Sequence, residues 1–117
     1  AFVPIEFHIQ QIGLENRLDP AQETNLFFAM QAIINNITKY SEARQAYLQI
    51  IKSTENNLDV MIEYDGKGFD YKKSIESGGQ GLLNIEIRIE TLLNGKISYD
   101  SNPEQNGTTI IMNIPLN

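Results

Sequence analysis

Residues 19–40, DPAQETNLFFAMQAIINNITKY, decide the fold, because they carry a helical pattern sustained over five turns or more. Asp19 is a favourable N-cap residue, and Pro20 suits the first position of a helix. The apolar side chains that recur at helical spacing are Leu26, Met30, Ile33, Ile34 and Ile37. We therefore predict a long helix that ends near Tyr40 and buries one face.

A second helix is predicted further along the chain. Its apolar positions are Leu82, Ile85, Ile89, Leu92 and Leu93. Asn94 and Gly95 follow, and this pair is typical of a helix C-terminus. The segment in front of this helix, residues 65–80, is rich in glycine and has no period, so we predict a long loop. A short helix between Tyr71 and Ser77 would escape such a pattern.

Strand patterns fill the rest of the chain. Ile5, Phe7 and Ile9 alternate with polar residues and predict a half-buried first strand. Further strands are predicted at 46–53 and 58–64, joined as a hairpin through 54–57, and at 96–101 and 108–116. This order predicts an α+β fold: a two-layer α/β sandwich with a mixed, mostly antiparallel sheet of about five strands and helices on one face.

The bulk composition limits the possible functions. A chain of 117 residues is the size of one domain, so we expect residues 1–117 to form a single unit, a fragment of a longer protein. The net charge of -6 argues against nucleic-acid binding and against direct membrane contact. There is no cysteine, which excludes disulfides and thiolate chemistry. No apolar run is long enough to span a bilayer, and a cytoplasmic location is compatible with all of this.

A polar stripe on the long helix is the first candidate for chemistry. Ala32, Asn36, Lys39 and Tyr40 lie three or four residues apart, roughly opposite the apolar face. Asn36 and Lys39 could therefore approach one ligand together. An ordinary solvated helix face explains the same pattern.

Glycines mark three further places. Asp65, Gly66 and Gly68 close a strand, where glycine lets the backbone turn sharply or approach a ligand. Residues 79–82, GQGL, open the second helix, whose free N–H groups suit a phosphate. Gly107 and Thr108 precede the last strand. Each of these alone is equally compatible with a plain turn or a plain helix start, and only their order and spacing together favour a site.

Taken in order, these segments resemble the GHKL superfamily of gyrase-type, chaperone, mismatch-repair and histidine-kinase ATPases. Residues 31–43, QAIINNITKYSEA, resemble its N box, and residues 64–70, YDGKGFD, resemble its first glycine box. Residues 79–82 with Asn84, Ile85 and Arg88 resemble its second glycine box, and Gly107-Thr108 with residues 114–116 its closing strand. The pattern is most similar to sensor kinases that work with LuxR-like response regulators.

The resemblance implies the ATP-binding (Bergerat-fold) catalytic domain of a two-component sensor histidine kinase, with Mg-ATP as its ligand. It implies that Asn36 coordinates Mg²⁺ and that Lys39 faces the phosphates. The remaining implied nucleotide contacts are Asp65, Gly66, Gly68, Gly79, Gly81, Leu82 and Thr108, under a lid over residues 70–80. The implied partners are a phosphoacceptor helical domain of the same homodimeric protein and a response regulator, in the cytoplasm.

Two positions depart from the family pattern. Ala32 stands where the N box usually has Glu, and Tyr64 stands where the first glycine box has the Asp that accepts the adenine amino group. Asp65 comes one residue late, and a one-residue slip on a strand turns a side chain to the other face unless a bulge intervenes. Losing this buried hydrogen bond costs about 1–3 kcal/mol, roughly ten- to a hundredfold in affinity. We therefore predict that the fold is kept and that nucleotide affinity is poor.

Two other functions stay open. One is a degenerate, nucleotide-poor pseudokinase module that acts through protein–protein contacts, which Tyr64 favours. The other is an anti-sigma-type serine kinase of the same superfamily, which the N box favours less. His8 is the only histidine and lies in a predicted strand, so we expect an ordinary strand residue and not a phosphoacceptor. The fragment is therefore not expected to complete a kinase cycle alone.

Overall fold

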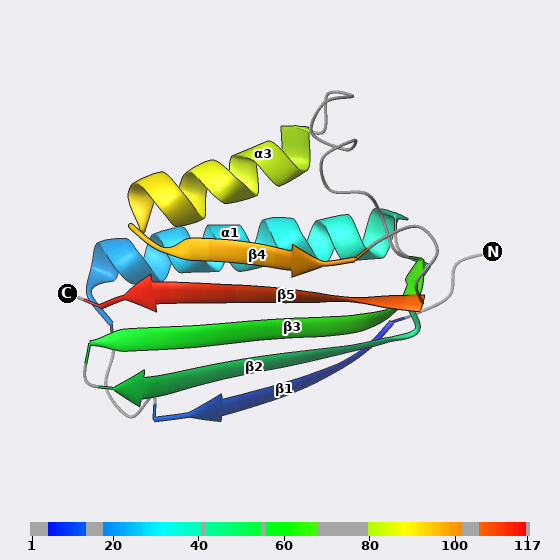
Figure 1. The fold of residues 1–117 in the computed structure, drawn as a ribbon, viewed down its shortest axis with the longest axis horizontal. Helices are drawn as coiled ribbons and strands as arrows, with labels where there is room; N and C mark the ends of the chain where they lie inside the picture. The colour runs from blue at the N-terminus through cyan, green and yellow to red at the C-terminus, as the bar shows by residue number, and fades with distance from the viewer. Residues whose placement is uncertain are drawn as a thin grey trace.

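The computed structural model describes residues 5–13, 18–40, 42–54, 56–67, 80–101 and 106–116. Its elements, in chain order, are β1 (Glu6–Ile12), α1 (Pro20–Tyr40), β2 (Gln45–Thr54), β3 (Asn57–Lys67), α3 (Gln80–Ile87), the π-helical segment η1 (Arg88–Leu92), β4 (Lys96–Asp100) and β5 (Asn106–Pro115). The five strands form one sheet, and Figure 1 shows that this sheet is open, with both helices on one side of it. The predicted two-layer α+β architecture is confirmed.

The sheet is mixed, as predicted. Its strand order is β1-β2-β3-β5-β4. β1 runs parallel to β2, whereas the β2–β3, β3–β5 and β4–β5 pairs are antiparallel. The long helix α1 connects the parallel pair, because parallel neighbours need a crossover. The short helix considered between Tyr71 and Ser77 lies outside the described residues.

The N-terminus of α1 is held by the residues that the sequence marks for it. The Asp19 carboxylate accepts a hydrogen bond from the backbone N–H of Gln22, at 3.3 Å. The Glu23 carboxylate reaches back to the backbone N–H of Leu18, at 3.0 Å. Two N–H groups that the helix cannot satisfy internally are thereby paired. The predicted start at Pro20 and end at Tyr40 are both confirmed.

One hydrophobic core fills the space between the helices and the sheet. The buried apolar side chains from the helical layer are Ala29, Ile33, Ile37, Ile85, Ile89 and Leu93. Those from the sheet and the segment leading into β2 are Ala43, Ala46, Leu48, Leu58, Val60, Ile62, Tyr64, Ile110, Met112 and Ile114. Within each central strand the buried residues alternate with residues that face away from the helices, so the other face of the sheet is uncovered.

The second helix ends where the sequence predicts. α3 continues as η1, and the chain then passes through Asn94, which has a φ of 53°. Gly95 follows, and a Cβ built at this position would lie 2.7 Å from the carbonyl oxygen of Asn113. Only a residue without a side chain fits this approach, so Gly95 lets the helical layer turn closely onto β5.

The prediction that the first strand is half-buried is wrong. All seven residues of β1 are exposed. Phe7 and Ile9 pair with Ala46 and Leu48, whose side chains are buried, but β1 is the edge strand and the helical layer does not cover it. Only Ile5, just before β1, packs partly against the core. Alternation therefore indicates a strand here without indicating burial.

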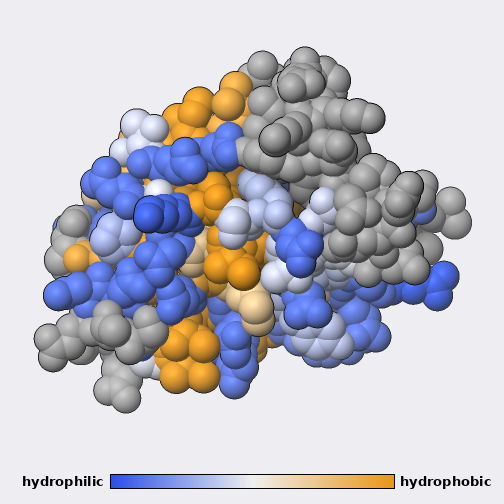
Figure 2. Space-filling view, viewed as in Figure 1, coloured by the Kyte–Doolittle hydropathy of each residue, from blue (hydrophilic) through white to orange (hydrophobic). Residues whose placement is uncertain are grey.

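The surface in the same orientation is mixed. Figure 2 shows hydrophobic and hydrophilic residues interleaved over the sheet, with hydrophobic atoms also along α3. The exposed large hydrophobic residues include Ile9, Tyr47, Ile87 and Ile111. None of the helices in the described ranges is long and apolar enough to cross a membrane.

Candidate functional site

The predicted stripe lies on α1, but the prediction that it is roughly opposite the apolar face is wrong, because its described residues lie beside the buried face. Asn36 is partly exposed, and Ala32, one turn earlier, packs against the edge of the core. Lys39 and Tyr40 belong to the last turn of α1, and their side chains lie outside the described part of the structure. The helix thus presents the Asn36 amide beside an alanine, with no carboxylate at position 32.

The first glycine segment forms a β-bulge at the end of β3. Tyr64 pairs with Thr108 of β5, and the next recorded pair is Lys67 with Asn106, so β3 carries one more residue than β5 across this step. Gly66 has a φ of 95°, a conformation that side chains rarely adopt. Gly66 therefore permits the bulge, and Gly68 lies outside the described residues.

Tyr64 is buried at this end of the sheet. Its side chain is only 4% exposed and points to the helical side, as do Leu58, Val60 and Ile62 before it. It shares a side-chain hydrogen bond with Thr108, which is itself buried. Burial raises the pKa of the Tyr64 phenol, although the Thr108 hydrogen bond lowers it in part.

A second tyrosine and a serine extend this cluster, and sequence analysis missed both. The hydroxyl oxygens of Ser101 and Thr108 are 2.6 Å apart. Burial raises the pKa of the Tyr99 phenol, as do the nearby Glu86, Tyr64 and Glu90. The alternation of Ile97 with Tyr99 in β4 was the only available signal that Tyr99 faces inward. Hydroxyl groups from β3, β4, β5 and the residue after β4 thus gather in a largely apolar layer.

Asp65 lies on the other side of β3 from Tyr64. Its side chain is exposed, and its Oδ1 accepts hydrogen bonds from the backbone N–H groups of Arg44, at 2.8 Å, and Gln45, at 2.9 Å. The hydrogen bond from the Gln45 amide is the largest cause that lowers the pKa of Asp65. The bulge follows Tyr64 and does not turn Asp65 inward, so this carboxylate ties β3 to the start of β2.

The second glycine segment opens a helix, as predicted. α3 begins at Gln80, so Gly81 and Leu82 lie in its first turn, whose N–H groups have no partner within the helix. Gly79 lies outside the described residues. Gly81 and Leu82, two of the predicted nucleotide contacts, therefore lie at a helix N-terminus.

The described residues offer few side chains that could bind a metal ion. Within the described ranges no group of three or more His, Asp or Glu side chains could hold a metal ion. The Asn36 side chain has one amide oxygen that could bind a metal ion, and Ala32 has no such atom. Mg²⁺ takes few protein oxygens and completes its shell with phosphates and water, so this donor set fits a nucleotide-borne Mg²⁺ better than a resident ion.

His8 lies in β1, which confirms the prediction that it is a strand residue. Its ring stacks on Tyr47, with centroids 4.7 Å apart. Its Nε2 lies 3.4 Å from a carboxylate oxygen of Glu6. His8 is therefore an exposed strand residue whose ring contacts neighbouring side chains on the sheet surface.

Comparison with known proteins agrees with this geometry. Residues 21–117 match the family model described as histidine kinase-, DNA gyrase B- and HSP90-like ATPase. The signal transduction histidine-protein kinase/phosphatase DegS of Bacillus subtilis is 34% identical over 116 residues. The sensor histidine kinase ComP of the same organism is 31% identical over 91 residues, 77% of this chain and 12% of ComP. Among solved structures, the blue-light activated histidine kinase EL346 of Erythrobacter litoralis superposes with a TM-score of 0.74 at 15% identity, over 96% of this chain and 35% of that chain.

The chain is much shorter than these proteins. The match to DegS covers 96% of this chain but only 29% of DegS. At 15% identity, the likeness to EL346 shows a shared fold.

Proposed function

The chain belongs to the histidine kinase-, DNA gyrase B- and HSP90-like ATPase family, and on that premise we propose that it is the ATP-binding catalytic domain of a two-component sensor histidine kinase. Relatives that are 34% and 31% identical are named histidine kinases. The observation that carries the proposal is the order of the elements: a polar helix stripe, a glycine bulge after a central strand, and a glycine-rich helix start, on the fold of this family.

The proposed ligand is Mg-ATP. Asn36 would supply one oxygen to the metal, and Lys39 would place its charge near the phosphates. The backbone N–H groups at the start of α3 would donate to phosphate oxygens, favoured by the helix dipole. Bound Mg²⁺ would neutralise phosphate charge, and the remaining contribution of the domain is to position the transferred phosphoryl group.

The proposed partners follow from the family. The phosphoryl group would pass to a histidine on a separate helical domain of the same dimeric protein, and from there to a response regulator. We propose that residues 1–117 are one domain of that longer protein, placed in the cytoplasm. His8 is a poor acceptor candidate, since its ring is stacked on Tyr47 within the sheet.

Two neighbouring asparagines of α1 provide a matched test of the metal role. Asn36 is partly exposed on the polar stripe, and Asn35 is exposed and points elsewhere. Nucleotide titrations with and without Mg²⁺ should show that Mg²⁺ strengthens ATP binding in the unmodified chain and in Asn35→Ala. Asn36→Ala should lose this strengthening. Equal Mg²⁺ dependence in all three proteins would remove Asn36 from the proposed site.

Tyr64 favours a second candidate, a nucleotide-poor module that signals through protein contacts. In this family the position carries the acid that accepts the adenine amino group. Here it carries a buried phenol hydrogen-bonded to Thr108. Asp65, the nearest carboxylate in sequence, is bound to the amides of Arg44 and Gln45. Both observations support the proposal that adenine is recognised poorly, and neither involves the residues proposed to contact the phosphates.

A further inference from the structure

A hollow of about 300 Å³ lies on the uncovered face of the sheet, where β2 begins and β3 ends. Its lining residues are Gln45, Tyr47, Glu63, Tyr64, Asp65, Gly107, Thr108 and Thr109. Tyr47 pairs with Glu63 across β2 and β3, and Glu63 pairs with Thr109 across β3 and β5. Their neighbours in sequence, Ala46, Tyr64 and Thr108, are buried on the helical side. The exposed walls therefore lie on the face of the sheet away from α1 and α3, whereas Tyr64 and Thr108, at the implied adenine position, border the same hollow.

The backbone explains why a hollow forms here. β3 bulges after Tyr64, which separates the strands locally and increases their twist. Opposite the bulge, Gly107 has a φ of 107° and no side chain to fill the gap. The volume is at the lower end of the roughly 300–1,000 Å³ typical of ligand sites, a size that suits one side chain or a small molecule.

The aromatic wall of the hollow is held in place from two sides. The Tyr47 ring is stacked on His8 of β1, with 13° between the ring planes. The Tyr47 hydroxyl donates a hydrogen bond to the side-chain oxygen of Gln45, at 2.7 Å. Because β2 lies between β1 and β3, the second face of the ring is on the side of β3, where Glu63 is the cross-strand partner of Tyr47. Tyr47 is still 50% exposed, so this face can be contacted from solvent.

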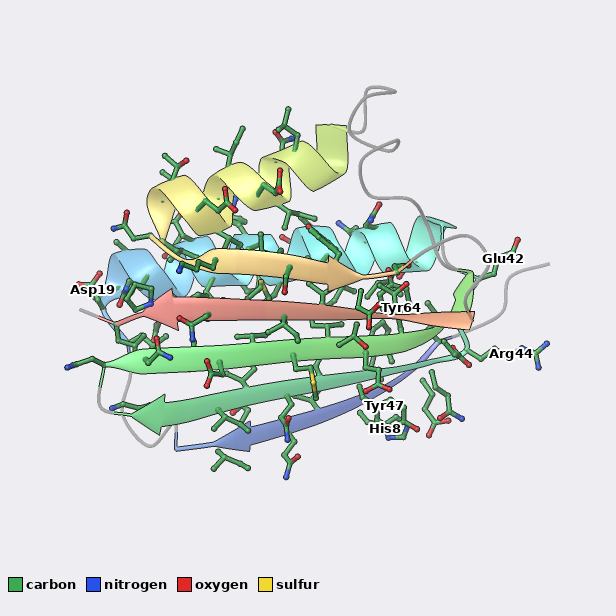
Figure 3. All side chains as sticks on the ribbon, in the orientation of Figure 1. His8, Asp19, Glu42, Arg44, Tyr47 and Tyr64 are labelled. Atoms are coloured by element: carbon green, nitrogen blue, oxygen red, sulfur yellow. The ribbon has the colours of Figure 1, made fainter. Side chains whose placement is uncertain are left out.

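The charge at the hollow is negative. Glu63 and Asp65 both line it. The cation beside Asp65 is Arg44, and Figure 3 shows the Arg44 side chain pointing outward from the end of the sheet, away from Tyr47 and His8. His8 lies beside the carboxylate of Glu6. The carboxylate of Glu63 thus stands across from an aromatic face in a chain whose net charge is -6.

We propose that this hollow binds the guanidinium group of an arginine side chain presented by a protein partner. A planar cation can stack on the open face of Tyr47 while its N–H groups donate to the Glu63 carboxylate. The Thr109 hydroxyl offers a further acceptor at the far wall. Arginine suits these walls better than lysine, because a guanidinium both stacks on aromatic rings and donates in a fork to a carboxylate.

Titration of short peptides into the ¹⁵N-labelled chain, followed by NMR, tests the proposal. The probes are blocked Gly-Arg-Gly, the same peptide with lysine, the same peptide with neutral citrulline, and free arginine. The arginine peptide should produce saturable shifts centred on Tyr47, Glu63 and Thr109, weakened by added salt. The lysine peptide should bind more weakly and the citrulline peptide should leave these signals in place. Equal shifts from citrulline, or shifts centred elsewhere, would overturn the proposal.

Four variants assign the contacts. Tyr47→Leu and Glu63→Gln should each raise the Kd of the arginine peptide roughly two- to fivefold, as expected for an exposed cation–π contact or ion pair. Tyr47→Phe keeps the ring and should retain binding, and Glu90→Gln removes an exposed acid of η1 and should also retain it. Unchanged binding in Tyr47→Leu would contradict the stacking. Tighter binding of free arginine than of the blocked peptide would show a small-molecule site and refute a protein partner.

Discussion

Tyr64 of β3 and Thr108 of β5 face each other across the central strands and share a hydrogen bond beneath the helical layer. Thr108 is also 2.6 Å from the hydroxyl of Ser101. Tyr64 therefore occupies the position where the family resemblance implies an acid that binds adenine. Its hydroxyl is already hydrogen-bonded within the fold. This hydrogen bond has consequences for stability as well as for ligand binding.

Removing the Tyr64 hydroxyl should destabilise the chain. Tyr64→Phe deletes one buried hydrogen bond and should lower the free energy of unfolding by about 0.5–1.5 kcal/mol. Tyr47→Phe deletes an exposed hydroxyl that contacts Gln45 and should have a smaller effect. Urea denaturation of the two variants measures both values. An equal loss in the two proteins would mean that the buried contact contributes nothing beyond a surface one.

The two faces of β5 should respond very differently to truncation. Ile110 is 3% exposed and Ile111 is 50% exposed, although they are neighbours in sequence. Ile110→Ala should lower the free energy of unfolding by about 2–5 kcal/mol, because it leaves a cavity in the core. Ile111→Ala should cost below about 1 kcal/mol. Chemical denaturation measures both values, and a larger loss for Ile111→Ala than for Ile110→Ala would contradict the described register.

Asp65 should contribute to acid sensitivity. The backbone N–H groups of Gln45 and Arg44 lower its pKa below the ordinary value of 3.8. A carboxylate whose pKa is lowered in the folded state stabilises that state at pH values above its ordinary pKa. This contribution disappears as the pH falls through the lowered pKa. Asp65→Asn should therefore differ most from the unmodified chain near neutral pH and converge with it in acid. Denaturation curves at several pH values test this, and a gap that stays constant down to strong acid would refute it.

Sequence analysis predicted the local elements well because their signals are local. The cap at Asp19, the apolar period of α1 and the Asn94-Gly95 ending each act within one or two turns of chain. The hairpin of β2 and β3 also follows from a short connection. These patterns predict which residues pair or pack within a segment.

The features that sequence analysis missed depend on contacts between distant segments. Asp65 binds amides some twenty residues earlier in the chain, at Arg44 and Gln45, and nothing in residues 64–70 indicates this. The exposure of β1 depends on how far the helical layer extends across the sheet. The Tyr47–His8 stack depends on the parallel register of β1 and β2. The predicted roles in nucleotide binding all stay predictions, namely those of Asn36, Lys39, Asp65, Gly66, Gly68, Gly79, Gly81, Leu82 and Thr108.

The state of the adenine position is the central claim of this account, and restoring the acid tests it most directly. Calorimetric titration of Mg-ATP and Mg-ADP into the unmodified chain and Tyr64→Asp, with Tyr64→Asn as an uncharged partner, measures nucleotide affinity. Thermal unfolding and NMR spectra of each variant establish that the fold is kept, because a buried aspartate carries its own cost.

We expect weak binding by the unmodified chain and a roughly tenfold or greater gain in Tyr64→Asp, since the variant restores an acceptor for a buried hydrogen bond to the base. Binding by the unmodified chain as tight as that of the variant would show that another group recognises adenine. Absence of binding in a folded Tyr64→Asp protein would contradict the nucleotide site itself.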